Sequence, residues 1–163
     1  MKLKASSPLA GALLTEKFCG LRSAPSLSEL SHSQRNHLNT IKLWAKNNEY
    51  GLPFWQLFDR RLLKTINGIS LKHRVSMASV ALRWVLQQPC IGSAVVTTGV
   101  GRIDRSQSLR EVFTFAFDDE DMALLEEAYM GGSFPTDKPL SSLEGEMLEG
   151  EDFLNLSDRR LWL

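Results

Sequence analysis

The sequence has few of the features that stabilise a secreted chain or anchor one in a membrane. Its two cysteines, Cys19 and Cys90, cannot build a disulfide framework, so we expect a reducing, cytosolic setting. No apolar run approaches the roughly 20 residues of a membrane-spanning helix, and the first residues lack the hydrophobic region of a signal peptide. The sequence therefore argues against a disulfide-rich scaffold and against a membrane partner.

Motifs of several functional classes are also missing. The sequence contains neither the Gly-x-Ser-x-Gly elbow of serine hydrolases nor the Gly-x-x-x-x-Gly-Lys loop of nucleotide hydrolases. Its three histidines, His32, His37 and His73, fall on polar helix faces or at helix ends, which predicts surface or capping roles, and they give no zinc spacing with the cysteines. Lysine and arginine are scattered rather than clustered with aromatic residues, which argues against a nucleic-acid partner.

The net charge of zero conceals a strong asymmetry along the chain. Residues 1–117 carry 16 Lys and Arg against 6 Asp and Glu, whereas residues 118–163 carry 3 against 13. Because Pro, Ser, Gly and Glu dominate from residue 133 onward, we interpret residues 1–132 as the folded domain and residues 133–163 as an acidic, weakly ordered tail. Either the two parts are simply solvated, or the basic part faces an anion such as a phosphate-bearing cofactor.

The clearest element of the sequence is a helix that begins after Ser76 and ends before Pro89. Ser76 is a typical N-cap, and a proline disfavours helical geometry at the residue before it. Apolar residues recur at helical spacing in between. The β-branched run from Ile91 to Val96 follows directly and predicts a buried strand, so helix and strand together indicate half of a βαβ repeat.

Four further elements are predicted from capping residues and apolar spacing. They are a very short strand from Leu3 to Ser7, a helix capped by Ser31 or Ser33 that ends near Asn47, a long helix from about Trp55 to His73, and a helix that opens on the acidic residues 118–121 and ends near Tyr129. The acidic residues are most simply explained as a favourable start of that last helix.

The run from Val75 to Pro89, with its Ala-Leu-Arg-Trp-Val-Leu-Gln-Gln-Pro ending and the Ala-Val-Val strand beyond it, resembles the late part of the aldo-keto reductases. Those enzymes are NADP-dependent (β/α)₈ barrels, so the resemblance implies an α/β fold, a partial TIM barrel made of the last two strand–helix units and mostly helical as it stands. A whole barrel typically needs roughly 250 residues and at least about 200. We therefore expect the C-terminal half of such an enzyme.

The resemblance implies that NADP is held by two segments. A Ser-Pro-Leu-x-x-Gly-x-Leu segment such as Ser7–Leu14 wraps the pyrophosphate in that family, and Thr97–Arg105 corresponds to the segment that binds the adenosine ribose and the 2′-phosphate. The implied cofactor residues are Ser7, Leu9, Gly11, Leu13, Thr97, Thr98, Gly99, Arg102 and Arg105. The residue types alone equally fit a plain Pro/Gly turn and a solvated helix start. Because Gln107–Glu111 departs from the family's Gln-x-x-Glu-Asn run, selectivity for NADP stays open.

The catalytic residues of that family have no counterpart in this sequence. The family reduces carbonyls with a Tyr general acid, helped by Lys, Asp and His, while NADPH delivers hydride, and all four residues precede the seventh strand. Tyr50 and Tyr129 fall in a loop and in a late helix. We predict a truncated homologue that keeps the cofactor loops and is inactive alone, a pseudoenzyme. The alternatives are an interaction module that assembles with itself or with a chain supplying the rest of the barrel, and a fragment of a longer reading frame.

Overall fold

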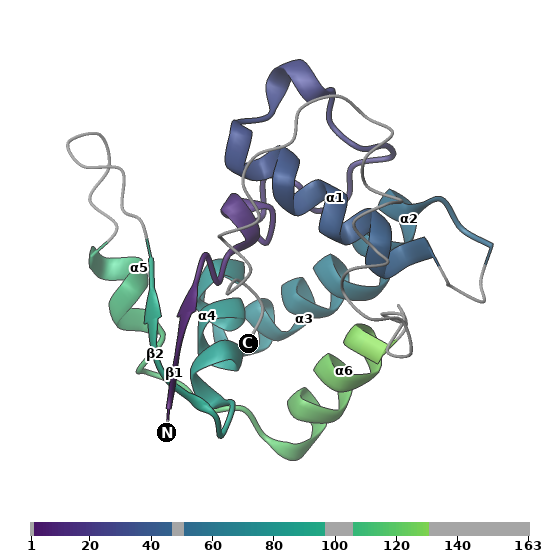
Figure 1. Ribbon diagram of the computed structural model, residues 1–163. Coiled ribbons are helices and arrows are strands. Elements are labelled where there is room, and N and C mark those ends of the chain that lie inside the picture. Colours follow the sequence, from purple (N-terminus) through teal and green to yellow (C-terminus); the bar gives the residue numbers. More distant parts are fainter. Residues whose placement is uncertain (1, 47–50, 97–105, 131–163) are drawn as a thin grey trace.

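The computed structural model describes residues 2–46, 51–96 and 106–130, in which a two-stranded sheet lies beside a larger body of helices (Figure 1). The elements, in chain order, are β1 (Leu3–Ser6), η1 (Ala10–Ala12), η2 (Leu27–Glu29), α1 (His32–Lys46), α2 (Phe54–Leu57), η3 (Phe58–Leu63), α3 (Lys64–His73), α4 (Met77–Gln87), β2 (Ile91–Val95), α5 (Ser106–Glu111) and α6 (Asp119–Met130). The mostly helical character with a small parallel sheet agrees with the expectation and is compatible with a partial barrel.

Helix α4 forms where the sequence predicts it. The Ser76 hydroxyl accepts a hydrogen bond from the Ser79 amide at 3.2 Å, and the helix ends at Gln87, two residues before Pro89. Met77 and Val80 lie on its fully buried stripe. The helix connects α3 to β2 and packs against both of them, so it joins the helical body to the sheet.

The long helix predicted from about Trp55 to His73 is present as one rod made of α2, η3 and α3. Its middle part, η3, is a π-helix, a wider turn than the α-helix and one often found at functional sites. This turn carries Asp59, which is 6% exposed and accepts a hydrogen bond from the Gly20 amide at 2.6 Å. No sequence signal predicted the π-turn or the contact of Asp59 with Gly20, 39 residues away.

The caps of the two remaining long helices explain where each begins. At α1, the Ser31 hydroxyl accepts from the Gln34 amide at 3.3 Å while the Gln34 side chain accepts from the Ser31 amide at 2.9 Å, which is a capping box and selects Ser31 over Ser33. At α6, Asp118 and Asp121 exchange the same kind of reciprocal bonds. Both predicted helix starts are confirmed.

The sheet pairs β1 and β2 in parallel, with Leu3 opposite Ile91 and Ser6 opposite Val95. The register shifts between Leu3 and Lys4, and a Cβ added to Gly92 at that place would lie 2.9 Å from Lys2 Cβ, so the irregularity requires a glycine there. The prediction that the second strand is buried is wrong. Only Ile91 is buried in β2, whereas Ala94 is half-buried and Gly92, Ser93 and Val95 are exposed.

The hydrophobic core lies among the helices rather than behind the sheet. Its fully buried large side chains come from α2, η3, the segment after η1, α1 and α4, and they include Trp55, Phe58, Leu13, Leu38, Leu57, Leu63, Met77 and Val80. Three of its rings pack edge-on or tilted, with centroids 6.4 Å apart for Phe18 and Trp55 and 5.5 Å apart for Trp55 and Phe58. The helical body therefore supplies the rigid support from which the strand ends extend.

Candidate functional site

The turn that follows β1 has a strained backbone. Ser7, Ala10 and Ala12 have positive φ values of 52°, 49° and 72°, and Gly11 between them has a φ of 65°. A left-handed conformation costs a residue with a Cβ roughly 1 to 2 kcal/mol, so this short stretch stores several such costs. Such outliers persist only where the surroundings fix them, and they cluster at ligand sites. The turn is therefore the first candidate for a functional segment.

Burial in the helical body and local hydrogen bonds hold this turn in place. Ala10 and Leu13 are buried in the core, and the Ala10 amide donates to the Ser7 carbonyl at 2.9 Å. The Thr15 hydroxyl donates to the Ala12 carbonyl at 2.8 Å, which holds the exit of the turn. Burial of Ala10 and Leu13 offsets the backbone strain, while Ser7 at the start of the turn is exposed.

Gly11 packs against the start of α1. A Cβ added there would lie 3.1 to 3.2 Å from the Ser33 hydroxyl oxygen, the Gln34 amide nitrogen and His37 Cδ2, which is tighter than ordinary van der Waals contact. The glycine is thus required both by its positive φ and by the close approach of α1. The atoms that approach Gly11 closely thus belong to α1 of the same chain.

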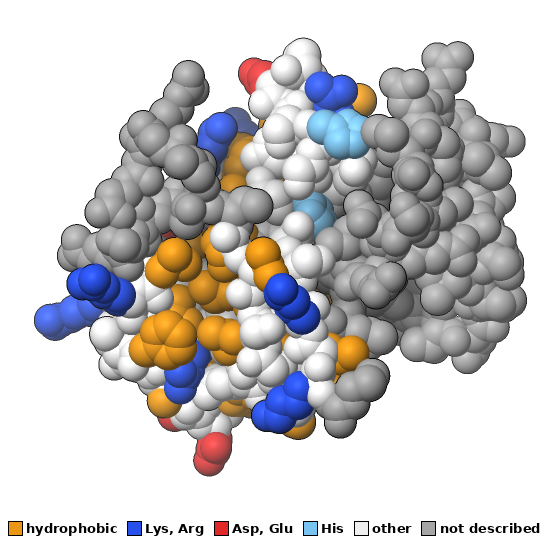
Figure 2. Space-filling view, turned by 60° about the vertical axis from the view of Figure 1, so that its left-hand side comes forward, with side chains coloured by type: hydrophobic (Ala, Val, Ile, Leu, Met, Phe, Trp, Pro, Cys, Tyr) orange, Lys and Arg blue, Asp and Glu red, His pale blue; other side chains and the backbone are white. Residues whose placement is uncertain are grey.

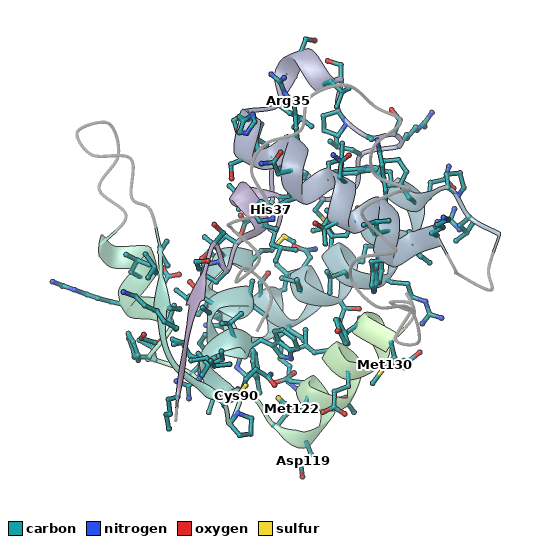
Figure 3. All side chains as sticks on the ribbon, in the orientation of Figure 1. Arg35, His37, Cys90, Asp119, Met122 and Met130 are labelled. Carbon is teal, nitrogen blue, oxygen red and sulfur yellow. The ribbon has the colours of Figure 1, made fainter. Side chains whose placement is uncertain are left out.

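His37 was expected on the surface, and that expectation is wrong. Its side chain is 6% exposed and lies on the face of α1 that meets the η1 turn (Figure 3). Burial lowers the pKa of the His37 imidazole, because a charged ring would lose its hydration there. The apolar stripe of α1 is wide enough to include this position, so His37 adjoins Leu38 and Ile41 in the packed face.

The residues predicted to bind a cofactor divide into two groups. In the first, Ser7 is exposed, Leu9 and Gly11 are half-buried, and Leu13 is fully buried in the core. In the second, all members lie outside the described residues, and their roles stay predictions: Thr97, Thr98, Gly99, Arg102 and Arg105.

The register of the sheet brings the starts of both groups together. Ser6 and Val95 are paired across the sheet, and they are the last residues of β1 and β2. Ser7 follows the first strand directly, and Thr97 follows the second strand after Val96. The two predicted segments therefore leave the same edge of a parallel sheet, the carboxyl edge, which is where ligands bind in α/β folds.

The N-terminus of α4 is held by two carboxylates that belong to different segments. Glu16 Oε1 accepts from the Met77 amide at 2.6 Å, and Glu111 Oε2 accepts from the Ser76 amide at 3.3 Å and from the Ser79 hydroxyl at 3.2 Å. A carboxylate at a helix N-terminus is stabilised by the helix dipole. The chain thus supplies the anions for this helix end, and no sequence signal had identified Glu16 or Glu111.

A second polar network joins α3 to α6. Asp121 is fully buried, and its oxygens accept from His73 Nε2 at 2.7 Å and from Lys72 Nζ at 2.9 Å. Lys72 also pairs with Asp118 at 2.7 Å and with Glu120 at 3.4 Å. The residues 118–121 are therefore more than a favourable helix start, because one of them carries the contact between two helices.

The charges of this network hold one another in their ionised forms. Burial alone would raise the pKa of Asp121, but hydrogen bonds from His73 and Lys72 and from the Asp118 amide outweigh it, so the net shift is downward. The hydrogen bond from Lys72 is the largest cause that lowers the pKa of Asp118, to about 2. The three carboxylates in turn raise the pKa of Lys72. The ring of His73 also packs against that of Phe115, with centroids 5.1 Å apart, so the contacts of His73 hold parts of the fold together.

Two kinds of function receive no support within the described residues. No group of three or more His, Cys, Asp and Glu side chains gathers there in a way that could hold a metal ion. None of the helices in those ranges is long and apolar enough to cross a membrane. The site that remains is the carboxyl edge of the sheet with its strained turn.

The sequence matches the model of a known protein family. A family model described as the Aldo/keto reductase family matches residues 1–130, which is most of the chain and includes every described element. No curated protein matches the sequence.

Proposed function

The chain belongs to the aldo/keto reductase family over residues 1–130, and on that premise we propose that it carries the NADP(H)-binding edge of a partial (β/α)₈ barrel. The turn Ser7–Leu14 would meet the pyrophosphate, and the segment Thr97–Arg105 would meet the adenosine ribose and the 2′-phosphate. The single observation that carries the proposal is the pairing of Ser6 with Val95, because it starts both segments from one edge of the sheet.

The residues of the first segment fit a phosphate in type and exposure. Ser7 offers an exposed hydroxyl, and the small residues around Gly11 keep side-chain bulk away from the turn. A strained turn of positive-φ residues also orients backbone amides in the way that anion-binding loops do. Leu9 flanks the same surface, half-buried, while Leu13 anchors the turn in the core.

The second segment would select the cofactor. Arginine forms bidentate hydrogen bonds with a phosphate, so Arg102 and Arg105 are the residues that we propose for the 2′-phosphate that distinguishes NADP from NAD. The residues that come after the strand would contact the adenosine ribose, and these are Thr97, Thr98 and Gly99. The positive balance of residues 1–117 supports an anionic ligand at this part of the molecule.

We propose that this chain does not reduce carbonyls by itself. When bound, NADPH supplies the hydride of the family's reaction, but the reaction also needs a proton donor, and no tyrosine of this sequence matches the family's position. Tyr129 lies at the end of α6, where its carbonyl accepts from Trp44 Nε1 at 2.9 Å and its ring lies 6.1 Å from that of Trp84. His73 and Lys72 each donate a hydrogen bond to Asp121, so these groups join α3 to α6.

A thermal melt with increasing NADPH tests the binding proposal. A ligand that binds only the folded chain stabilises it by about 2.7 kcal/mol at 100 times its Kd, so the Tm should rise steadily with NADPH concentration. The rise should be smaller with NADH, and Arg102→Ala or Arg105→Ala should remove the difference between the two. Ser7→Ala should reduce the rise in Tm with NADPH. Ser28→Ala, which changes an exposed serine outside the turn, is the control and should leave the rise unchanged. A cooperative melt that millimolar NADPH leaves unchanged would refute the proposal.

The absence of reduction is tested separately. The purified chain is mixed with NADPH and an aldehyde or ketone, and the loss of absorbance of NADPH is compared with a blank without protein. We expect no difference. Oxidation above the blank that depends on the chain would show that a proton donor is present after all.

A second candidate function is an interaction module, and the exposed sheet is the observation that favours it. Hydrophobic side chains gather on the face of the molecule that carries the sheet and α5, with lysine and arginine around them (Figure 2). Val95 is 40% and Phe113 is 74% exposed. A chain that supplies further strands, or a second copy, would cover this face. A clean monomer in sedimentation with a cooperative melt would argue against it.

A further inference from the structure

We propose that the N-terminus of α4 is a joint that fixes the strained turn Ser7–Leu14 relative to the end of α5, with Glu16 and Glu111 as its positioning residues. The joint itself rests on hydrogen bonds between described residues. Its effect on cofactor binding rests on the proposed function. Neither glutamate touches a ligand in this scheme. Each acts through the segment that it holds.

Glu16 ties the strained turn to α4. It lies two residues beyond the turn Ser7–Leu14, and its carboxylate accepts from the Met77 amide at 2.6 Å across 61 residues of sequence. Between them, Thr15 binds the Ala12 carbonyl, so turn, Thr15 and Glu16 form a continuous path to the first residue of the helix. A short hydrogen bond with an ionised acceptor is about twice as strong as a neutral one.

Glu111 makes the corresponding contact from the other side. It is the last residue of α5, the helix that begins directly after the second candidate segment. Its carboxylate accepts from the Ser76 amide and the Ser79 hydroxyl, and Ser79 is 2% exposed. The two glutamates therefore meet the first turn of one helix from two parts of the chain that lie 95 residues apart in sequence.

The N-terminus of α4 is not an anion site, because carboxylates of the chain itself occupy it. The amide of Met77 is bound by Glu16, and the amide of Ser79 is bound by the Ser76 hydroxyl. A phosphate at this place would meet two carboxylates and would be repelled by both. The anion is instead directed to the edge of the sheet, where the turn leaves β1.

Amide hydrogen exchange is the direct test of the joint. Glu16→Ala removes the acceptor of the Met77 amide, so exchange at Met77 and in residues 9–14 should become about tenfold faster or more, the factor that corresponds to losing one charge-assisted hydrogen bond. Glu16→Gln keeps an oxygen acceptor and should lie between Glu16→Ala and the wild type. Glu111→Ala should have the same effect at Ser76. Glu126→Ala, an exposed glutamate on α6, should change none of these rates.

Cofactor affinity is measured on the same variants. Where the wild type binds NADPH, Glu16→Ala and Glu111→Ala should each weaken the Kd about tenfold, with Glu16→Gln recovering part of the loss. Unchanged exchange at Met77 and in the turn overturns the joint. Faster exchange with an unchanged Kd overturns the positioning role. A wild type that binds no NADPH overturns the proposed function instead, and the exchange rates then decide the joint alone. If Glu16→Ala does not fold, Glu16→Gln carries the same comparison.

Discussion

The helical body and the two-stranded sheet of this chain bury their residues to very different extents. In the body, Trp55, Phe58 and Leu63 are at most 2% exposed, and α1, α2, α3 and α4 contribute to one continuous core. In the sheet, only Ala5 and Ile91 are buried, and neither belongs to that core. An isolated pair of strands is at best marginally stable in water.

The difference shows how stability and function are divided in the chain. The body can hold its conformation through apolar packing, and it anchors the sheet through α4, which contacts both. The sheet contributes little packing, but its register places the end of β1 beside the end of β2. Substitutions in the body should therefore change the free energy of unfolding, whereas substitutions on the open face of the sheet should change ligand or partner binding.

The largest expected effect contrasts two phenylalanines. Phe58→Ala empties a fully packed site in the body and should cost about 3 to 5 kcal/mol of unfolding free energy. Phe113→Ala, two residues after α5, removes a side chain that is 74% exposed and should change stability by about 0.5 kcal/mol or less. Urea denaturation of both variants measures the difference. Equal losses would mean that the open face is covered in solution.

A smaller effect is expected at the contact between α3 and α6. Asp121→Asn leaves the His73 and Lys72 hydrogen bonds partly unsatisfied at a buried position, and it should cost about 1 to 3 kcal/mol. The control is Glu120→Gln, because this side chain is 77% exposed and its pairing with Lys72 should contribute less than about 1 kcal/mol. Similar losses for the two would contradict the central role of Asp121.

The same contact predicts how stability depends on pH. The pKa of Asp121 is lowered, and the pKa of Asp118 is lowered to about 2, so both carboxylates stabilise the folded chain above their unfolded values near 4. That stabilisation is lost as the pH falls from about 4 through the folded values. The raised pKa of Lys72 adds stability below its ordinary value, and that part is lost only at strongly alkaline pH.

Urea unfolding at a series of acid pH values checks this dependence. The wild type should lose stability below about pH 4, and Asp121→Asn should lose less, so the two curves should converge on acidification. Parallel curves would mean that other carboxylates cause the acid unfolding.

A further effect is expected at the turn that joins the two regions. Gly11→Ala must adopt a φ of 65° and meet α1 at 3.1 Å, so it should cost about 2 kcal/mol. Gly20→Ala is the matched control, because its φ is 81° and no atom lies within 4 Å of the added Cβ, so only the backbone cost of about 1 kcal/mol remains. Thermal or urea unfolding measures both, and equal costs would show that the approach of α1 is not limiting.

The sequence was a sufficient guide where the signal is local. Ser76 with the apolar spacing after it predicted α4, Pro89 predicted its end, and Ser31 was one of two caps offered for α1. Each of these depends on a few neighbouring residues and on the orphan amides of a helix end. The resemblance to the aldo-keto reductases was likewise carried by contiguous residues, and the family match over residues 1–130 confirmed it.

The expectations that failed depend on contacts between distant segments. His37 is buried because the η1 turn packs on α1, and β2 is exposed because no further strand or helix covers its outer face within the described residues. Asp59, Glu16 and Glu111 bind amides 39, 61 and 35 residues away, at Gly20, Met77 and Ser76. No periodicity or motif in one segment indicates which distant amide a carboxylate will accept from.

The sequence by itself determined where the long helices form and to which family the chain belongs, because these follow from side-chain types at short spacing. Only the tertiary structure decided that Ser6 and Val95 end side by side, that the turn after β1 is strained against α1, and that two glutamates meet at the start of α4. The physical reason is that hydrogen bonds and burial between distant segments depend on the closed chain, in which a favourable contact must offset the entropy of closing the loop between its partners.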